Sequence, residues 1–149
     1  MRDRETLCMS GSPQPRTPAS ISYRMAAVRQ SDTKPELALR KLVRALGMRY
    51  RVCCRGLPGR PDLSNRSRRW CIFVHGCFWH GHRCKRGRLP KVNLHFWKPK
   101  IEENKRRDEA VRKELRGLGY RVLTVWQCQL GQTDKVTARL AKFLNRMGE

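Results

Sequence analysis

Two apolar runs dominate the pattern of hydrophobic and polar positions. Residues 70–74 (WCIFV) are continuously apolar and predict a buried strand, and residues 120–126 (YRVLTVW) are rich in β-branched and aromatic side chains and predict a second strand. Residues 48–52 alternate between apolar and basic positions and predict another strand. Between them, the segment 57–63 (LPGRPDL) contains two prolines that fix its backbone, so it predicts a rigid turn that holds Asp62 in place.

Helical periodicity surrounds these strands. A helix is expected to begin at Thr33, with Pro35 in its first turn and Glu36 completing a capping box, and to end at Gly47. Its apolar stripe is formed by Leu39, Leu42, Val43 and Leu46. The capping role alone accounts for Glu36, although that residue also extends the stripe toward the start of the helix.

A longer helix is predicted from Phe96 or Lys98 to Leu118, with Pro99 near its first turn. Its inward stripe would comprise Ile101, Asn104, Asp108, Val111, Leu115 and Leu118. Because a buried carboxylate is costly unless it is paired, Asp108 is a candidate site residue. The alternative is a frayed first half, with the stripe beginning only at Val111.

The order of elements defines the fold class. A final helix from about Thr133 completes the order helix, strand, strand, strand, helix, strand, helix, which predicts an α/β domain with a mixed central sheet flanked by helices. A further short helix is expected before this series, over residues 21–31. Residues 1–20 contain three prolines and are expected to be a disordered tail. Residues 21–149 are expected to form a single domain.

Charge identifies the class of partner. The 149 residues include 34 Lys and Arg against 12 Asp and Glu, which gives a net charge of +22. Such an excess is typical of proteins that bind nucleic acid, because phosphate contacts release counterions. A membrane partner is disfavoured, since the chain has no long apolar run.

Seven cysteines and the absence of a signal-peptide pattern at residues 1–12 predict a reduced, cytoplasmic protein in which some thiols bind metal. Cys77, His82 and Cys84 have the spacing C-x4-H-x-C, and a structural zinc needs a fourth ligand. Cys128 is favoured because the ends of the two apolar strands can lie side by side. Cys53 and Cys54 remain alternatives, whereas Cys71 lies inside an apolar strand and is expected in the core.

Within residues 74–84, the zinc ligands leave His75 and His80 for chemistry, and three carboxylates could converge on them: Asp62, Glu36 and Asp108. Hydrolysis of a phosphodiester needs a hard cation such as Mg²⁺, which carboxylates bind, and a group that transfers a proton near neutral pH, which histidine provides. The alternative for each histidine is a purely structural role.

Adjacent aromatic residues interrupt this stretch. Phe78 and Trp79 lie between Cys77 and His80, and Trp97 follows Phe96 further along the chain. Aromatic side chains on a DNA-facing loop can wedge between base pairs. Packing around the zinc is the alternative for Phe78 and Trp79.

Four segments resemble the very-short-patch mismatch repair endonucleases: LPGRPD at 57–62, IFVHGCFWH at 72–80, FW at 96–97 and YRVLTVW at 120–126. The likeness extends from residue 22 to about residue 145. It implies a fold related to type II restriction endonucleases. It also implies nicking of double-stranded DNA 5′ to the thymine of a T:G mismatch, the lesion left when 5-methylcytosine deaminates.

The resemblance also implies roles for individual residues. Asp62 and the main-chain carbonyl of Val74 would bind catalytic Mg²⁺, and His75 and His80 would act at the phosphate that is cut. Glu36 and Asp108 would orient these groups. A structural zinc would be held by Cys77, His82, Cys84 and Cys128. The DNA would be intercalated by Phe78, Trp79, Trp97 and Met25.

Gly81 and Arg83 replace histidines of the family motif, but neither position is an expected ligand. The sequence context of the mismatch could follow a partner methyltransferase. We expect a monomer that acts on the bacterial nucleoid, with repair proteins as further partners. The competing hypothesis is a zinc-stabilised nucleic-acid-binding module that does not cut.

Overall fold

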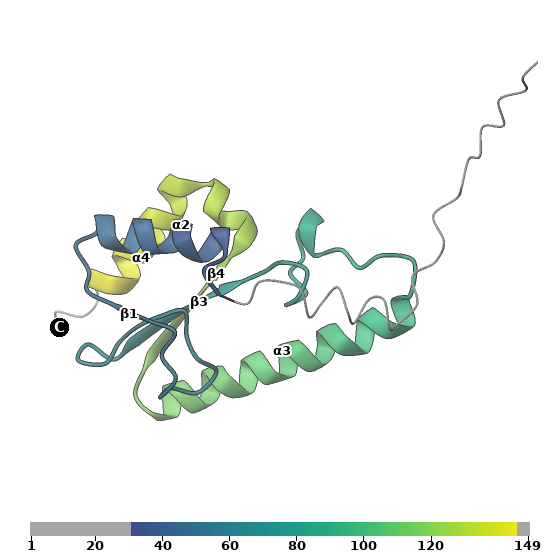
Figure 1. Ribbon diagram of the computed structural model, residues 1–149, viewed down its shortest axis with the longest axis horizontal. Helices are drawn as coiled ribbons and strands as arrows, with labels where there is room; N and C mark the ends of the chain where they lie inside the picture. The colour runs from purple at the N-terminus through teal and green to yellow at the C-terminus, as the bar shows by residue number, and fades with distance from the viewer. Residues whose placement is uncertain (1–30, 146–149) are drawn as a thin grey trace, which may run out of the picture.

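A four-stranded sheet lies between helices in the computed structural model, which describes residues 31–145 (Figure 1). The expected tail, the expected helix over 21–31 and Met25 lie outside the described residues. The strands are β1 (Arg51–Val52), β2 (Leu63–Asn65), β3 (Trp70–His75) and β4 (Arg121–Trp126). The helices are α2 (Lys34–Ala45), α3 (Leu94–Gly117) and α4 (Thr133–Asn145), with short 3-10 turns η1 (Lys85–Gly87) and η2 (Gln127–Gly131).

The sheet is mixed, as the order of elements predicts. Its strand order is β1-β2-β3-β4, with β1–β2 and β2–β3 antiparallel and β3–β4 parallel. In the register, Leu63 lies opposite Ile72, and His75 lies opposite Trp126. The start of β2 therefore lies beside the carboxyl ends of β3 and β4, at one end of the strands.

Helices cover both faces of the sheet (Figure 1). Trp70 and Ile72 of β3 pack into a core with α2 and α4, whereas Cys71 and Phe73 pack into a second core with Leu115 of α3. A central strand buried on both faces explains why residues 70–74 are continuously apolar rather than alternating.

Several predicted boundaries are wrong in detail. The strand expected over 48–52 is reduced to the exposed pair Arg51–Val52, because β1 pairs only with β2 and forms the edge of the sheet. Helix α3 begins at Leu94, so Pro99 lies inside the helix rather than in its first turn. Leu118 is 49% exposed because it follows the last helical turn.

The other features of the α3 stripe are confirmed. Ile101, Asn104 and Leu115 are buried, while Asp108 and Val111 are partly buried. The alternative of a frayed first half is therefore wrong. At α2, the Thr33 hydroxyl donates to the Glu36 carboxylate (2.8 Å) and makes no hydrogen bond to the helix backbone, so the expected capping box is replaced by a side-chain pair.

The turn before β2 is fixed to α3 at Gly59. This residue has φ +68°, and a Cβ atom there would lie 2.3 Å from Cγ1 of Val111. We expect Gly59→Ala to lower the free energy of unfolding by roughly 2–3 kcal/mol, because a positive φ and a clash in a packed contact both oppose it. Urea unfolding measures this, with Gly131→Ala as the control, since nothing lies within 4 Å of its added Cβ.

Candidate active site

Asp62 reaches the end of β3 from the neighbouring strand. It directly precedes β2, and the antiparallel register brings its carboxylate to Val74, whose main-chain N–H donates to Oδ2 at 2.7 Å. Burial raises the pKa of Asp62 to about 6, although the hydrogen bond from Val74 opposes this shift. The carboxylate is thus held by the backbone in a position where a cation would favour its ionised form.

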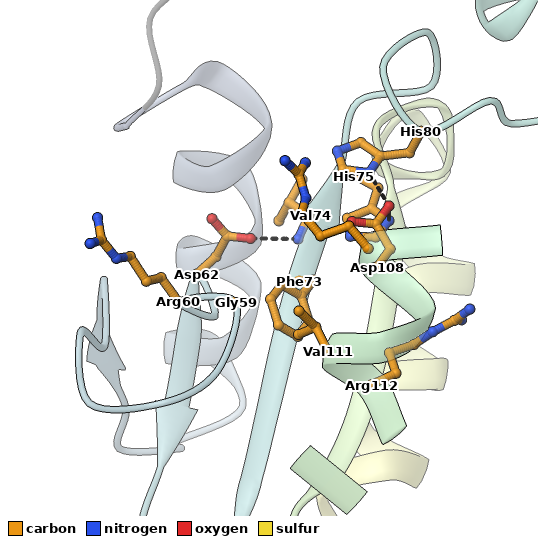
Figure 2. A pocket seen from close by; sticks show the side chains of 11 residues that line it. Gly59, Arg60, Asp62, Phe73, Val74, His75, His80, Asp108, Val111 and Arg112 are labelled. Carbon is orange, nitrogen blue, oxygen red and sulfur yellow. Dashed lines mark hydrogen bonds and ion pairs between the residues drawn. The ribbon is translucent and has the colours of Figure 1, made fainter. Parts of the chain in front are cut away.

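Two stacked imidazoles and a carboxylate lie on the other side of β3 (Figure 2). The rings of His75 and His80 are 3.8 Å apart and inclined by 10°. Nδ1 of His80 lies 2.5 Å from Oδ2 of Asp108, and Nδ1 of His75 lies 4.0 Å from the same oxygen. Asp108 is partly buried, and its pairing with His80 offsets the free-energy cost of burying a carboxylate.

The charges of this group follow from burial and contact. Burial and then the charge of His80 lower the pKa of His75 to about 4, so His75 is neutral at pH 7. For Asp108, burial works to raise the pKa, but the hydrogen bond and charge of His80 outweigh it and leave the pKa below its usual value. The site therefore combines an ionised carboxylate with a neutral imidazole beside it.

Asp62 and the histidine group share one cavity of about 540 Å³. Its walls are formed by Gly59, Arg60, Asp62, Phe73, Val74, His75, His80, Arg107, Asp108, Val111 and Arg112. Figure 2 shows Asp62 approaching from the β2 side and Asp108 from α3, with the end of β3 between them. Ligand atoms of His75, His80 and Asp108 lie within 4.8 Å of one another, and Asp62 lies outside that group.

Glu36 does not line this cavity. Its buried carboxylate accepts hydrogen bonds from the Asp32 main-chain N–H (3.0 Å) and the Thr33 hydroxyl, and it lies 3.5 Å from Arg40. Its charge still contributes to the raised pKa of Asp62, after burial, which is the larger cause. Glu36 therefore acts on Asp62 through its charge without lining the cavity, and its predicted role in the site remains a prediction.

A second cluster lies beside the cavity, where β3 and β4 end. Ligand atoms of Cys77, His82, Cys84 and Cys128 all lie within 4.8 Å of one another. The hydrogen bond from His82 lowers the pKa of Cys84 to about 6, so its thiol ionises readily. Three thiols and one imidazole are a donor set typical of structural zinc, so this cluster is a candidate zinc site.

The alternative thiol ligands lie elsewhere. Cys54 is buried with Sγ 2.6 Å from the Ser64 hydroxyl oxygen, and Cys71 is buried in β3 near the Arg121 carbonyl. Cys53 is exposed and is not part of the cluster. The choice of Cys128 as the fourth member of the cluster follows from the parallel pairing of β3 with β4.

The aromatic residues form a cluster of their own. The rings of Phe78 and Trp97 are 4.9 Å apart, and those of Trp79 and Trp97 are 6.0 Å apart. Phe78 and Trp79 are partly exposed, whereas Trp97 is buried beneath them. Intercalation by these three residues remains a prediction, and Trp97 is the least accessible of them.

Sequence reasoning missed several contributors to the site. Asn104 was recognised only as an inward polar residue, but its side-chain amide donates to the Trp79 carbonyl (2.9 Å) and so ties the aromatic loop to α3. Arg60, Arg107 and Arg112 line the cavity. In a chain with 34 basic residues, no sequence signal separates these three from the rest.

Comparison with a solved structure supports the fold. The chain resembles the catalytic domain of the homing endonuclease I-Bth0305I, with a TM-score of 0.55 and 20% identity, covering 79% of this chain and all of that domain. This likeness concerns the fold alone. Together with the cavity of carboxylates and imidazoles, it confirms the predicted endonuclease-like α/β fold.

Sequence comparison identifies the family. The model of the DNA mismatch endonuclease Vsr family matches residues 15–86. Relatives include the type II nicking enzyme V.XorIIP of Xanthomonas oryzae (46% identical, covering 87% of this chain and 95% of the relative). Another is the DNA mismatch endonuclease Vsr of Escherichia coli (41%, covering 80% and 76%). The chain belongs to the Vsr family of DNA endonucleases.

This membership confirms the predicted family and enzyme class, and it disfavours the hypothesis of a module that does not cut. The chain also matches the type II nicking enzyme V.NmeAIP of Neisseria meningitidis (39% identical, covering 88% of this chain and 94% of the relative). Within residues 31–145, no helix has the length and apolar character needed to cross a bilayer.

Proposed function

We propose that this protein nicks one strand of a DNA duplex 5′ to the thymine of a T:G mismatch, in Mg²⁺-dependent hydrolysis, and thereby starts very-short-patch repair. The observation that carries the proposal is the shared cavity of Asp62, His75, His80 and Asp108 at the edge of the sheet. The flanking sequence that is read would follow a partner methyltransferase.

Asp62 and the main-chain carbonyl of Val74 would hold the Mg²⁺, because both offer the oxygen donors that this ion prefers. When bound, the ion would polarise the phosphate and lower the pKa of attacking water. Glu36, whose charge acts on Asp62, would help to orient this ligand. The hydrogen bond from the Val74 N–H fixes one oxygen of Asp62 and so limits how its carboxylate can turn.

His75 and His80 would transfer or position protons at the phosphate. Because Nδ1 of His80 is held by Asp108, its Nε2 is the nitrogen left to face the substrate. His75, neutral at pH 7 and stacked on His80, offers an unprotonated ring nitrogen that can position the attacking water, although its pKa of about 4 makes it a weak base. The same three residues could also ligate a metal, but the orienting contact of Asp108 with His80 favours proton transfer.

The surrounding residues would recognise the substrate. The charge of +22 supplies the attraction to the DNA backbone. Phe78, Trp79 and Trp97 would enter the stack beside the mismatch, with Met25 as a further wedge. Zinc held by Cys77, His82, Cys84 and Cys128 would fix the loop that carries them. We further propose that residues 21–149 act as one domain and one monomer at the nucleoid, with repair proteins as partners.

A labelled T:G duplex tests this function directly. We expect a single nick 5′ to the thymine when Mg²⁺ is present, no nick when Mg²⁺ is omitted, and no nick in the matched T:A duplex. Denaturing gel electrophoresis locates the cut. Equal cutting of the T:A duplex would contradict mismatch recognition, and cutting of both strands would contradict nicking.

A further inference from the structure

We propose that Arg107 binds the phosphate group that is cut, gripping its non-bridging oxygens from the α3 wall of the cavity. The inference rests on the proposed function, because it assigns a residue to the phosphate of that same site. Arg107 directly precedes Asp108 on α3 and lines the cavity with Asp62, Val74, His75 and His80.

The pairing of charges among the described residues leaves two arginines of the cavity, Arg60 and Arg107, without an acidic partner. Asp108 is held by His80, and Arg112 forms an ion pair with Glu109. Arg107, by contrast, is exposed and makes no ion pair or side-chain hydrogen bond within residues 31–145. Its charge acts on Asp108 and, after the charge of Arg112, on His75. A guanidinium without a protein acceptor beside a reaction cavity is suited to an anionic ligand.

The chemistry of phosphodiester cleavage requires such a group. Negative charge accumulates on the non-bridging oxygens as water attacks, and cations placed there in advance stabilise the transition state. The planar guanidinium matches two phosphate oxygens at once. Arg60 is less suited, because its side chain lies on the far side of Asp62 and points away from the imidazoles (Figure 2).

The preceding residue provides a matched control. Arg106 is also exposed and on α3, but it lines a different groove with His95, Phe96, Pro99, Lys100 and Glu103. Arg106→Gln and Arg107→Gln therefore remove the same charge from the same helix. Only the second removes it from the cavity.

The first experiment measures single-turnover nicking of the duplex at saturating protein. We expect Arg107→Gln to slow nicking by about 100-fold, the usual effect of losing one donor to a developing oxyanion, whereas Arg106→Gln stays within about twofold of the unsubstituted protein. Arg107→Lys should recover part of the rate, because it restores charge without the two-pronged geometry. A rate for Arg107→Gln within about threefold of Arg106→Gln would overturn the proposal.

The second experiment is independent of the DNA substrate. Inorganic phosphate is added to each full-length protein while the imidazole resonances of His75 and His80 are followed by NMR. We expect these resonances to shift in the unsubstituted protein and in Arg106→Gln, and to stay in place in Arg107→Gln. Equal shifts in both variants would overturn the proposal. Equal nicking of T:G and T:A duplexes would instead contradict the proposed function. The phosphate-induced shifts in the Arg106→Gln and Arg107→Gln variants would still show whether Arg107 binds phosphate.

Discussion

Replacing Asp62 by Asn is expected to lower the single-turnover nicking rate by roughly 1,000-fold, because the several kcal/mol that a bound cation contributes to the transition state are lost with its carboxylate ligand. Binding of the T:G duplex should persist, since phosphate contacts dominate affinity. Nicking gels and electrophoretic mobility shifts measure the two effects separately.

The control is Asp134→Asn, which makes the same chemical change at an exposed position in the first turn of α4. It should leave both nicking and binding unchanged. The assignment of Asp62 would be wrong if Asp62→Asn nicked the duplex at the rate of the Asp134 variant.

The buried position of Asp62 also predicts how pH affects the reaction. Its pKa is raised to about 6, so the folded state binds a proton more tightly than the unfolded chain does. The stability that this proton provides is present below the unfolded pKa and is lost as pH rises through about 6. Above that pH the buried, ionised carboxylate lowers the free energy of unfolding, so Asp62→Asn should raise the melting temperature measured without Mg²⁺.

Activity should have the opposite dependence on pH, because the ionised carboxylate is the form that binds the cation. Below pH 6, the Mg²⁺ concentration for half-maximal nicking should rise by about tenfold per pH unit, as protons compete for the site. Rates measured against Mg²⁺ concentration at about pH 5 and about pH 7 test this. An unchanged Mg²⁺ requirement would show that Asp62 is not the ligand.

Cys128→Ser is expected to have the largest effect on stability. Its thiol joins those of Cys77 and Cys84, so its loss opens a closed four-ligand cluster. Substitutions that remove a structural metal are among the most destabilising, so we expect the free energy of unfolding to fall by roughly 4 kcal/mol. This corresponds to a fall of roughly 10 °C in melting temperature. Metal analysis should show the loss of zinc from the purified variant, and thermal unfolding should show the fall.

Cys53→Ser is the matched control, because Cys53 is exposed and outside the cluster. That variant should keep its zinc and its melting temperature. A Cys128→Ser variant that retained one zinc per chain would contradict the proposed ligand set.

Local patterns along the chain were sufficient to predict much of the fold. The apolar run at 70–74 identified β3 as a buried strand, because a strand buried on both faces needs apolar residues at every position. The β-branched and aromatic run at 120–126 identified β4 as a strand, although only Leu123 and Val125 of β4 are buried. The periodicity of α3 identified Asp108 as facing inward, because residues three and four apart share one face of a helix. Boundaries were less certain, since the length of β1 depends on its partner at the edge of the sheet.

The sequence by itself determined which residue types could carry the chemistry: Asp62 in a rigid turn, His75 and His80 after a buried strand, and the cysteine cluster. Only the tertiary structure decided their geometry. The strand register brings Asp62 to Val74 across β2 and β3, and α3 brings Asp108 onto His80. Glu36 is not part of the cavity wall, whereas Arg107 is. Such distinctions depend on contacts between residues far apart in the chain, which no local periodicity encodes.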